Sequence, residues 1–368
     1  MQYPEWSDNF ASVTKPLRLG IVGANIARGW ARDAHLPALR RLPQFTVVAV
    51  SARTQAIAEE ARNEFGASRA YSDSLALVRA PDVDIVAVTV KVPEHRAVVL
   101  AALESGKHVY CEWPLGRDLA EAKEMAAAVK REQHVMIGTQ GLSAPAIRHA
   151  AKLAREGAVG RHKVLRVFSP TAGWGPDVLP HYAYLQNSIN GATLETIAGG
   201  HTLAAIEAIV GPYVEVDARK TTFVEKVRVQ GSDELLPRTC ADHMMVLGRH
   251  SSGCVSTLEV IGGVVSEPFT LDLRGERGWL QVKGVAPGGY QVGTLSLQTS
   301  FPCEPAPEPN VADLSAGPPV HVGEAYVRFA RDIQSGTRTV PDFEDAVRLT
   351  RLLHKIDLAA ETGIRQSL

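Results

Sequence analysis

Short apolar runs alternate with amphipathic stretches through the first 138 residues of the chain. The runs at 17–22, 45–50 and 84–90 show no strict alternation of apolar and polar residues, which is typical of strands buried on both faces. Stretches with apolar residues at helical spacing separate these runs. The pattern therefore predicts a doubly wound parallel sheet, whose ligand crevice lies at the carboxyl ends of the strands. The predicted helices occupy 30–41, 55–65, 94–105 and 118–132, and two further strands occupy 108–111 and 135–138.

The second half of the chain has a different pattern, with consecutive strands joined by glycine-rich turns. Apolar and polar residues alternate with period two in 222–229 and 271–275, which predicts an antiparallel sheet with one covered face. We expect the helices on that face at 196–210, 323–334 and 343–361. The predicted strands are 162–169, 215–224, 240–248, 253–262, 269–275 and 278–284.

The predicted fold class is therefore α/β, with two domains. An N-terminal doubly wound Rossmann domain is expected at 16–139, and a C-terminal α/β domain with a large, mainly antiparallel open sheet at 140–368. Two domains agree with the chain length, because single hydrophobic cores stop growing at roughly 250–300 residues. The second domain is expected to bind substrate. Its open sheet face predicts a homodimer or homotetramer, since such a face is usually buried by a symmetry mate.

Charge and composition exclude several classes of partner. The formal net charge is -1 without a long run of lysine and arginine, so we expect no nucleic-acid partner. No segment reaches the roughly 18 consecutive apolar residues of a membrane helix, and the first sixteen residues do not resemble a secretory signal. The four cysteines are scattered without a C-x-x-C pair. This spacing argues against a metal site and predicts a cytoplasmic protein with reduced thiols.

The first strand is followed by a glycine-containing turn that predicts a dinucleotide site. The expected pattern is G-x-G-x-x-G at the start of a helix, and this chain keeps Gly23 but has Asn25 at the second glycine and Gly29 one residue late. Asparagine tolerates left-handed dihedral angles, so the turn remains possible. We therefore predict NAD or NADP as the cofactor, with Gly23, Asn25 and Ile26 among its contacts. The alternative is a tight turn without a ligand.

The end of the second strand bears on the choice between the two cofactors. NAD enzymes usually place an acidic residue there to bind the adenosine ribose, whereas this chain has Ser51 and Arg53. A hydroxyl and a guanidinium suit a 2′-phosphate, so the sequence favours NADP slightly over NAD. Alternatively, Arg53 only faces solvent.

Four motifs resemble the Gfo/Idh/MocA family of sugar-type oxidoreductases. They are HLPAL at 35–39, VKVPEH at 90–95, GKHVYCEWPLG at 106–116 and GGH at 199–201. The resemblance implies cofactor contacts from Val90, His95, Glu112 and Trp113. Within the family, the first domain is most similar to a Gal80-like branch of regulators, which bind a dinucleotide and act through protein contacts.

Two positions depart from the family pattern, and both concern its chemistry. Family members typically read E-K-P where this chain has Glu112, Trp113 and Pro114, and they tend to carry an aspartate where this chain has Ile197. The family's lysine is implied to act as the base, and an indole cannot accept a proton. If the chain is an enzyme, its base comes from elsewhere.

Several other side chains are candidates for that base. His201 has the closest family counterpart, and Lys91, His181, Tyr182 and His95 are the other candidates. Each has a plain alternative as a packing residue or an exposed side chain. The leading hypothesis is an NAD(P)-dependent oxidoreductase that acts on a hydroxyl or carbonyl of a sugar, polyol or glycoside. The alternative is a catalytically silent dinucleotide-binding regulator that recognises a partner protein.

Overall fold

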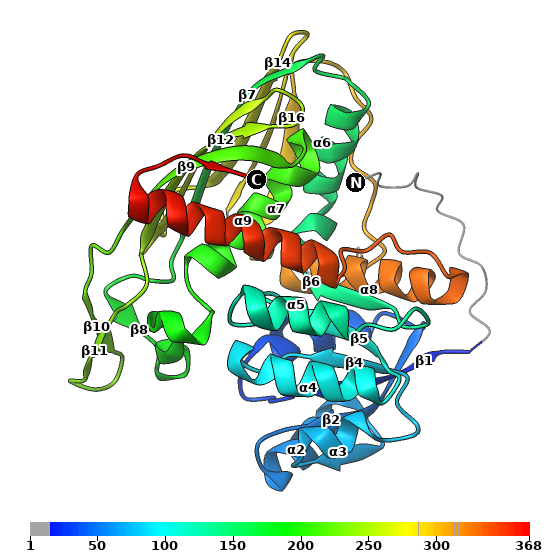
Figure 1. Cartoon of the computed structure of the whole chain (residues 1–368). Helices are drawn as coiled ribbons and strands as arrows, with labels where there is room; N and C mark the ends of the chain where they lie inside the picture. The colour runs from blue at the N-terminus through cyan, green and yellow to red at the C-terminus, as the bar shows by residue number, and fades with distance from the viewer. Residues whose placement is uncertain (1–14, 286, 312–313, 315–316) are drawn as a thin grey trace. The chain divides into compact units, whose positions relative to one another are not determined.

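The protein is described by a computed structural model that covers residues 15–285, 287–311, 314 and 317–368 (Figure 1). The chain divides into two compact units. The first unit covers the described parts of Met1–Gly116, Ala120–Gly138 and Pro309–Val347, and the second covers those of Arg117–Leu119, Thr139–Glu308 and Arg348–Leu368. In the described part of the chain, no helix is long and apolar enough to cross a membrane.

The first unit contains a six-stranded parallel sheet. Its strand order is β3-β2-β1-β4-β5-β6, which confirms the predicted doubly wound topology. The central strand β4 is buried along its whole length, as its unbroken apolar run predicts. The strands are β1 (Leu17–Val22), β2 (Phe45–Ser51), β3 (Arg69–Tyr71), β4 (Ile85–Val88), β5 (His108–Glu112) and β6 (Val135–Gly138). The edge strand β3 escaped prediction because three residues are too few to show a period.

The first helix differs from its prediction. The segment 30–41 was expected to be one α-helix, but it begins as the π-helix η1 (Ala31–His35) and continues as α1 (Leu36–Leu39). The amide of Leu36 donates to the carbonyl of Ala31, five residues earlier. Pro37 follows and has no N–H to donate. Helical spacing of apolar residues does not distinguish these two helix types.

The other helices of this sheet follow the sequence more closely. Helix α2 (Gln55–Phe65) begins at the side-chain cap of Thr54 and ends at Gly66 in the left-handed region, as its polar and glycine boundaries predict. Helix α4 is Val92–Glu104, and a short α3 (Ser74–Val78) was not predicted.

Helix α5 (Leu119–Ala127) ends five residues before its predicted end at 132. The buried side chain of Gln133 accounts for the difference. Its amide nitrogen donates to the carbonyls of Leu103 and Lys107, and its oxygen accepts from the amide of Lys130. These contacts draw the chain into a turn.

Helix α8 (Pro318–Ser335) belongs to the first unit, although the sequence analysis placed 323–334 on the sheet of the second domain. Its residues Val320, Tyr326 and Phe329 join the hydrophobic core that contains β1 and α1. The amphipathic pattern predicted the helix correctly but could not identify the surface that the helix covers.

The second unit contains an eight-stranded, mostly antiparallel sheet. Its order is β16-β15-β14-β7-β13-β12-β9-β17, and β7 and β13 are a parallel pair. The sheet confirms the predicted large open sheet and adds β16 and the C-terminal β17 at its edges. The strands are β7 (His162–Thr171), β9 (Tyr213–Thr221), β12 (His243–His250), β13 (Val255–Gly262), β14 (Phe269–Gly275), β15 (Trp279–Val285), β16 (Thr294–Thr299) and β17 (Gln366–Ser367).

Side chains alternate between the two faces of this sheet. On β12, Met244 and Val246 are buried, whereas Met245 and Leu247 are 48% and 54% exposed. In Figure 1, α6 (Pro145–Arg155) and α7 (Gly200–Val210) lie along this sheet. The helix α9 (Phe343–Thr362) follows α8 in the chain.

The segment 222–229 was expected to belong to the large sheet, but its second half, 226–229, forms part of a separate three-stranded sheet. This small lobe contains β8 (Asp177–Val178), β10 (Lys226–Val229) and β11 (Leu235–Pro237) in the order β11-β10-β8. Its core is formed by Val178, Val227 and Val229. The alternation correctly predicted a strand with one buried face, but the partner strands are too short to be recognised in the sequence.

Candidate functional site

The predicted dinucleotide turn lies at the carboxyl ends of β1, β2 and β4. Gly23 has φ +95°, and a Cβ atom there would lie 2.9 Å from both the backbone nitrogen and the Cγ1 of Val90. The amides of Gly23 and Ala24 donate to the carbonyl of Ser51 at 3.0 and 2.8 Å. Only glycine fits this close crossing without strain. The close approach to Val90 therefore requires a glycine at position 23, whether or not a cofactor binds there.

Asn25 shapes the same turn through a local hydrogen bond. Its Oδ1 accepts from the amide of Ala27 at 2.9 Å, as asparagine side chains commonly do in turns. The half-buried Ile26 packs against the hydrophobic core of the first unit. These contacts define the turn, and the predicted cofactor contacts of both residues stay predictions.

The two predicted 2′-phosphate ligands are placed differently. Ser51 is fully buried, and its hydroxyl lies 3.1 Å from that of Ser74. Arg53 is exposed in the turn that leads to α2. A buried and hydrogen-bonded hydroxyl is poorly placed to meet a ligand, so Arg53 is the stronger candidate of the two.

His95 holds the end of β4 to the segment after β5. Its Nδ1 lies 3.0 Å from the carbonyl of Pro114, and its Nε2 lies 3.0 Å from that of Val90. Burial lowers the pKa of His95. Because both ring nitrogens face main-chain carbonyls, the ring has a clear structural role, and its predicted cofactor contact stays a prediction. Lys91 is exposed at the start of α4.

Glu112 ends β5 and is held by a buried histidine. The Nε2 of His35 lies 2.9 Å from Glu112 Oε1, and the Nδ1 of His35 lies 2.8 Å from the hydroxyl of Tyr326. The side chain of Glu112 is 12% exposed. Gly138 lies beside it on β6, where a Cβ atom would come within 2.8 Å of Glu112 Oε2. The carboxylate is thus fixed at the strand end, where open α/β sheets bind their ligands.

Two tyrosines complete the surroundings of this carboxylate. The rings of Tyr110 and Tyr326 lie 4.9 Å apart, edge to face. Burial raises the pKa of both phenols, and the charge of Glu112 raises them further. Both phenols therefore stay neutral at physiological pH. Trp113, which follows Glu112, is buried.

Sequence reasoning missed His35 and Tyr326 as parts of this cluster. His35 is the first residue of the HLPAL motif, which in the sequence analysis supports only the resemblance to the family and does not indicate a contact with Glu112. Tyr326 lies on α8, more than two hundred residues from Glu112 in the chain, and no local pattern connects the two.

In the second unit, His201 lies in the first turn of α7, directly after the π-helix η5 (Glu195–Gly199). The side chain is 3% exposed. The hydroxyl of Tyr290 donates to the His201 carbonyl at 2.8 Å, and the hydroxyl of Thr202 donates to the carbonyl of Ala198. The backbone around His201 is therefore held from two sides. Ile197, where the family resemblance implies an aspartate in other members, lies within η5.

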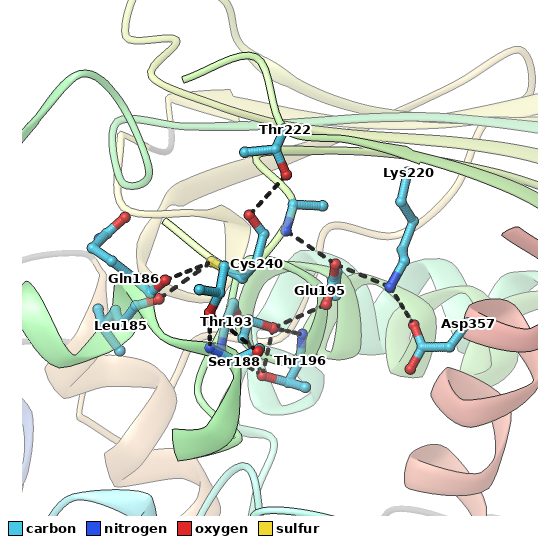
Figure 2. A network of polar contacts seen from close by, with 12 residues as sticks. Leu185, Gln186, Ser188, Thr193, Glu195, Thr196, Lys220, Thr222, Cys240 and Asp357 are labelled. Carbon is cyan, nitrogen blue, oxygen red and sulfur yellow. Dashed lines mark hydrogen bonds and ion pairs between the residues drawn. The ribbon is translucent and has the colours of Figure 1, made fainter. Parts of the chain in front are cut away.

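A network of charged side chains supports the π-helix η5, which precedes His201 (Figure 2). The Nζ of Lys220 on β9 lies 3.3 Å from Glu195 and 2.7 Å from Asp357. Glu195 also accepts from the hydroxyl of Thr193 and the amide of Ala241. Burial raises the pKa of Glu195, and Lys220 partly opposes that shift. Because π-turns interrupt regular helix bonding, these contacts help to fix η5. No local pattern in the sequence indicates this network.

His181 and Tyr182 lie on the 3₁₀ helix η3 (Pro180–Gln186), with ring centroids 4.2 Å apart. His181 is half-buried, and Tyr182 is 43% exposed. A fully buried guanidinium anchors the end of this helix, because Arg238 donates to the Gln186 side chain and to Asp242, both at 2.8 Å. The loop is therefore an ordered platform within the second unit.

The five predicted base candidates thus fall in two units. Lys91 and His95 belong to the first unit, whereas His181, Tyr182 and His201 belong to the second. Among the described residues, no group of three or more His, Cys, Asp and Glu side chains is arranged to hold a metal ion.

Comparison with known protein families identifies both halves of the chain. Residues 17–139 match the oxidoreductase family with an NAD-binding Rossmann fold called GFO_IDH_MocA, and residues 145–284 match the C-terminal domain of Gal80p. The first match ends close to the boundary between β6 and the second unit.

Individual relatives include both enzymes and regulators. The dehydrogenase aclE of Aspergillus oryzae is 26% identical over 95% of this chain and 98% of its own length. The galactose/lactose metabolism regulatory protein GAL80 of Kluyveromyces lactis is 28% identical over 77% of this chain and 67% of its own length. A structure of levoglucosan dehydrogenase with NADH and levoglucosan superposes with a TM-score of 0.80, at 21% identity over 96% of this chain and 99% of that one. Residues 17–139 therefore belong to the Gfo/Idh/MocA oxidoreductase family, as an NAD(P)-binding Rossmann domain, and residues 145–284 form a domain of the Gal80p C-terminal type.

Proposed function

We propose that this protein is an NAD(P)-dependent oxidoreductase that acts on a hydroxyl or carbonyl of a sugar, polyol or glycoside. The observation that carries the proposal is the carboxylate of Glu112, which His35 fixes at the carboxyl end of β5. Such a carboxylate is suited to hold a ribose hydroxyl. The levoglucosan dehydrogenase relative, which is crystallised with NADH and a sugar, supports the substrate class.

The residues of the dinucleotide turn fit the cofactor. At Gly23 the turn passes so close to Val90 that a Cβ atom would be obstructed, which agrees with the first glycine of the dinucleotide fingerprint, the residue that allows the tight turn. When bound, the nicotinamide accepts or donates the hydride. The chain would bind the phosphates with the backbone after Gly23 and the ribose with Glu112. We further propose that Arg53 binds a 2′-phosphate, which would favour NADP.

Oxidation of a sugar hydroxyl also needs a group that accepts its proton. Trp113 occupies the position of the family's lysine and cannot accept one. We assign this role to His201, because histidine is the side chain that most often acts as a general base and because the backbone of His201 is held by Tyr290. Lys91, His181 and Tyr182 remain alternative candidates.

The proposal is tested by measuring NAD(P)H formation with a panel of sugars and polyols. His201→Ala is expected to lower turnover by about 10²–10⁴, the usual contribution of general acid–base catalysis, and to leave cofactor affinity unchanged. Trp113→Lys introduces an amine at the position of the family's base and is expected to raise turnover on simple sugars. Turnover that survives His201→Ala would refute the assigned base.

A second candidate function is a dinucleotide-binding regulator that turns nothing over. The replacement of the lysine by Trp113 and the Gal80p-type C-terminal domain favour it. In that case no sugar in the panel gives NAD(P)H, whereas the cofactor still binds. The two functions are therefore separated by one assay on the unmodified protein.

We also propose that the protein forms a homodimer or homotetramer through the exposed face of the large sheet. This face combines the apolar Phe168, Met245 and Leu247 with charges of both signs, such as Arg166 and Asp272. A mixed surface of this kind can pair with itself about a two-fold axis. The cytoplasm is the proposed compartment, in agreement with the four free cysteines.

A further inference from the structure

Three side chains of the first unit form a hydrogen-bonded triad that ends on the candidate ribose carboxylate. The hydroxyl of Tyr326 lies 2.8 Å from His35 Nδ1, and His35 Nε2 lies 2.9 Å from Glu112 Oε1. Tyr326 and His35 are fully buried, whereas the side chain of Glu112 is 12% exposed. All three residues belong to the same compact unit. The triad therefore leads from the core of this unit to a partly exposed carboxylate at the end of β5.

The contacts of the triad determine which nitrogen of His35 carries the proton. A carboxylate only accepts hydrogen bonds, so the N–H of His35 is on Nε2 and points to Glu112. Nδ1 then accepts from the hydroxyl of Tyr326, whose phenol is neutral because burial raises its pKa. A doubly protonated ring would turn the Tyr326 oxygen into an acceptor, and no other group among the described residues would then accept the phenol proton. The neutral Nε2–H form of His35 therefore satisfies all three side chains.

The members of the triad come from distant parts of the sequence, and each is held by its own element. His35 ends the π-helix η1, Glu112 ends β5, and Tyr326 lies on α8. The ring centroid of Tyr326 lies 4.9 Å from that of Tyr110 and 5.1 Å from that of Phe45, both edge to face. Because close-packed rings have little freedom to move, the hydroxyl of Tyr326 has a fixed position. Its hydrogen bond to Nδ1 in turn fixes the orientation of the imidazole and of the N–H that reaches Glu112.

From this geometry we infer that His35 and Tyr326 are positioning residues for the dinucleotide. His35 binds one oxygen of Glu112 and holds the carboxylate in a single orientation without neutralising its charge. The ribose hydroxyls then donate to an acceptor that is both charged and already oriented. Orienting a side chain before its ligand arrives lowers the entropic cost of binding. The inference rests on the proposed function, in which Glu112 binds the ribose, and it adds the two residues through which η1 and α8 control cofactor affinity.

The test compares two amides of different length at position 35. In His35→Gln the side-chain amide reaches the place of the imidazole Nε2–H and still donates to Glu112, whereas the shorter amide of His35→Asn ends near the place of Nδ1. The two variants bury the same chemical group and differ in the contact with Glu112. Tyr326→Phe removes only the hydroxyl that orients the imidazole. Phe45→Leu is the packing control, because it removes a ring that contacts Tyr326 and has no hydrogen-bonding group in its side chain.

Two quantities are measured for each variant: the NADH affinity by fluorescence titration, and the thermal midpoint of the free protein. His35→Asn should weaken NADH binding by about tenfold or more, the effect of losing one hydrogen bond to a charged group. Tyr326→Phe should weaken it by about three- to tenfold, the effect of one neutral hydrogen bond, because the ring proton is then free to move to Nδ1. His35→Gln should stay within about threefold of the unmodified protein. Phe45→Leu should lower the thermal midpoint and leave NADH affinity unchanged.

Several results would overturn the inference. Equal NADH affinity in His35→Gln and His35→Asn would do so, as would affinities that follow the thermal midpoints through all the variants, which would indicate a purely structural role. Nitrogen NMR spectra of labelled histidine that place the proton of His35 on Nδ1 would contradict the assigned direction.

Glu112→Gln separates this inference from the proposed function. Unchanged NADH affinity in Glu112→Gln would refute the ribose contact itself, and the positioning role with it. Weakened NADH binding in Glu112→Gln, together with unchanged binding in His35→Asn and Tyr326→Phe, would refute only the positioning role.

Discussion

Removal of the buried guanidinium of Arg238 should loosen the small lobe and the adjoining helix η3, which carries His181 and Tyr182. The Arg238 side chain is 0% exposed, and its partner Asp242 is 4% exposed. The guanidinium also donates to Gln186 and to the carbonyl of Gly175. Arg238→Met breaks all these contacts and leaves a buried carboxylate without its counter-charge.

The expected loss of stability follows from the partners that remain. Breaking a buried ion pair by removing one member usually costs about 3–5 kcal/mol. Asp242 still accepts from the amides of Phe223 and Val224, both at 2.8 Å. We therefore expect a loss near the lower end, about 3 kcal/mol. Arg228→Met is a matched control in the same lobe, because Arg228 is 67% exposed and lies 3.6 Å from Asp177. Its loss should be at most about 1 kcal/mol.

Hydrogen-exchange mass spectrometry measures this difference locally. Peptides from 175–191 and 222–242 should exchange much faster in Arg238→Met than in Arg228→Met, because the opening free energy of the lobe falls. Adding Asp242→Asn to Arg238→Met removes the unpaired charge and should restore part of the protection. Equal exchange in the two arginine variants would refute the structural role that we give to Arg238.

Four further predictions concern the cofactor, the open sheet and acid stability. Gly23→Val should abolish NAD(H) binding measured by calorimetry, because the backbone crossing leaves no room for a side chain. Arg53→Ala should weaken NADP more than NAD by about 1.5–3 kcal/mol, the range for a hydrogen bond to a charged group; equal losses would show that Arg53 does not contact the 2′-phosphate. Met245→Lys combined with Leu247→Lys should give a monomer by light scattering if the exposed sheet face is the interface. Burial lowers the pKa of His108 to about 4, so the unfolded chain binds its proton first and stability should fall as pH drops from about 6.5 towards 4. His108→Gln should make the free energy of unfolding, measured in urea, less dependent on pH in this range. An unchanged pH dependence would contradict the prediction.

The sequence predicted the parallel sheet and most strands of the open sheet because their apolar patterns are local. An unbroken apolar run such as 84–90 indicates a strand that is buried on both faces. The alternation on β14 indicates a strand that is buried on one face. The surface that α8 covers could not be predicted, since an amphipathic helix shows only that it has a buried face. The same limit hid His35 and Tyr326 around Glu112, because their contacts join segments far apart in the chain. Ser51 illustrates a different limit, since residue type alone did not reveal that its hydroxyl is buried against Ser74.

The position of α8 has a consequence for synthesis on the ribosome. The six strands of the first unit are complete at Gly138, but Tyr326 and Phe329, which close its core, lie on α8. About 180 residues separate the end of β6 from α8, so roughly 10–40 s of translation pass between them at ordinary rates. During this interval the nascent sheet exposes the apolar surface of β1 and α1 that α8 later covers. The growing chain should therefore depend on chaperones that bind apolar segments, and a fragment that ends near residue 139 should aggregate when it is expressed alone.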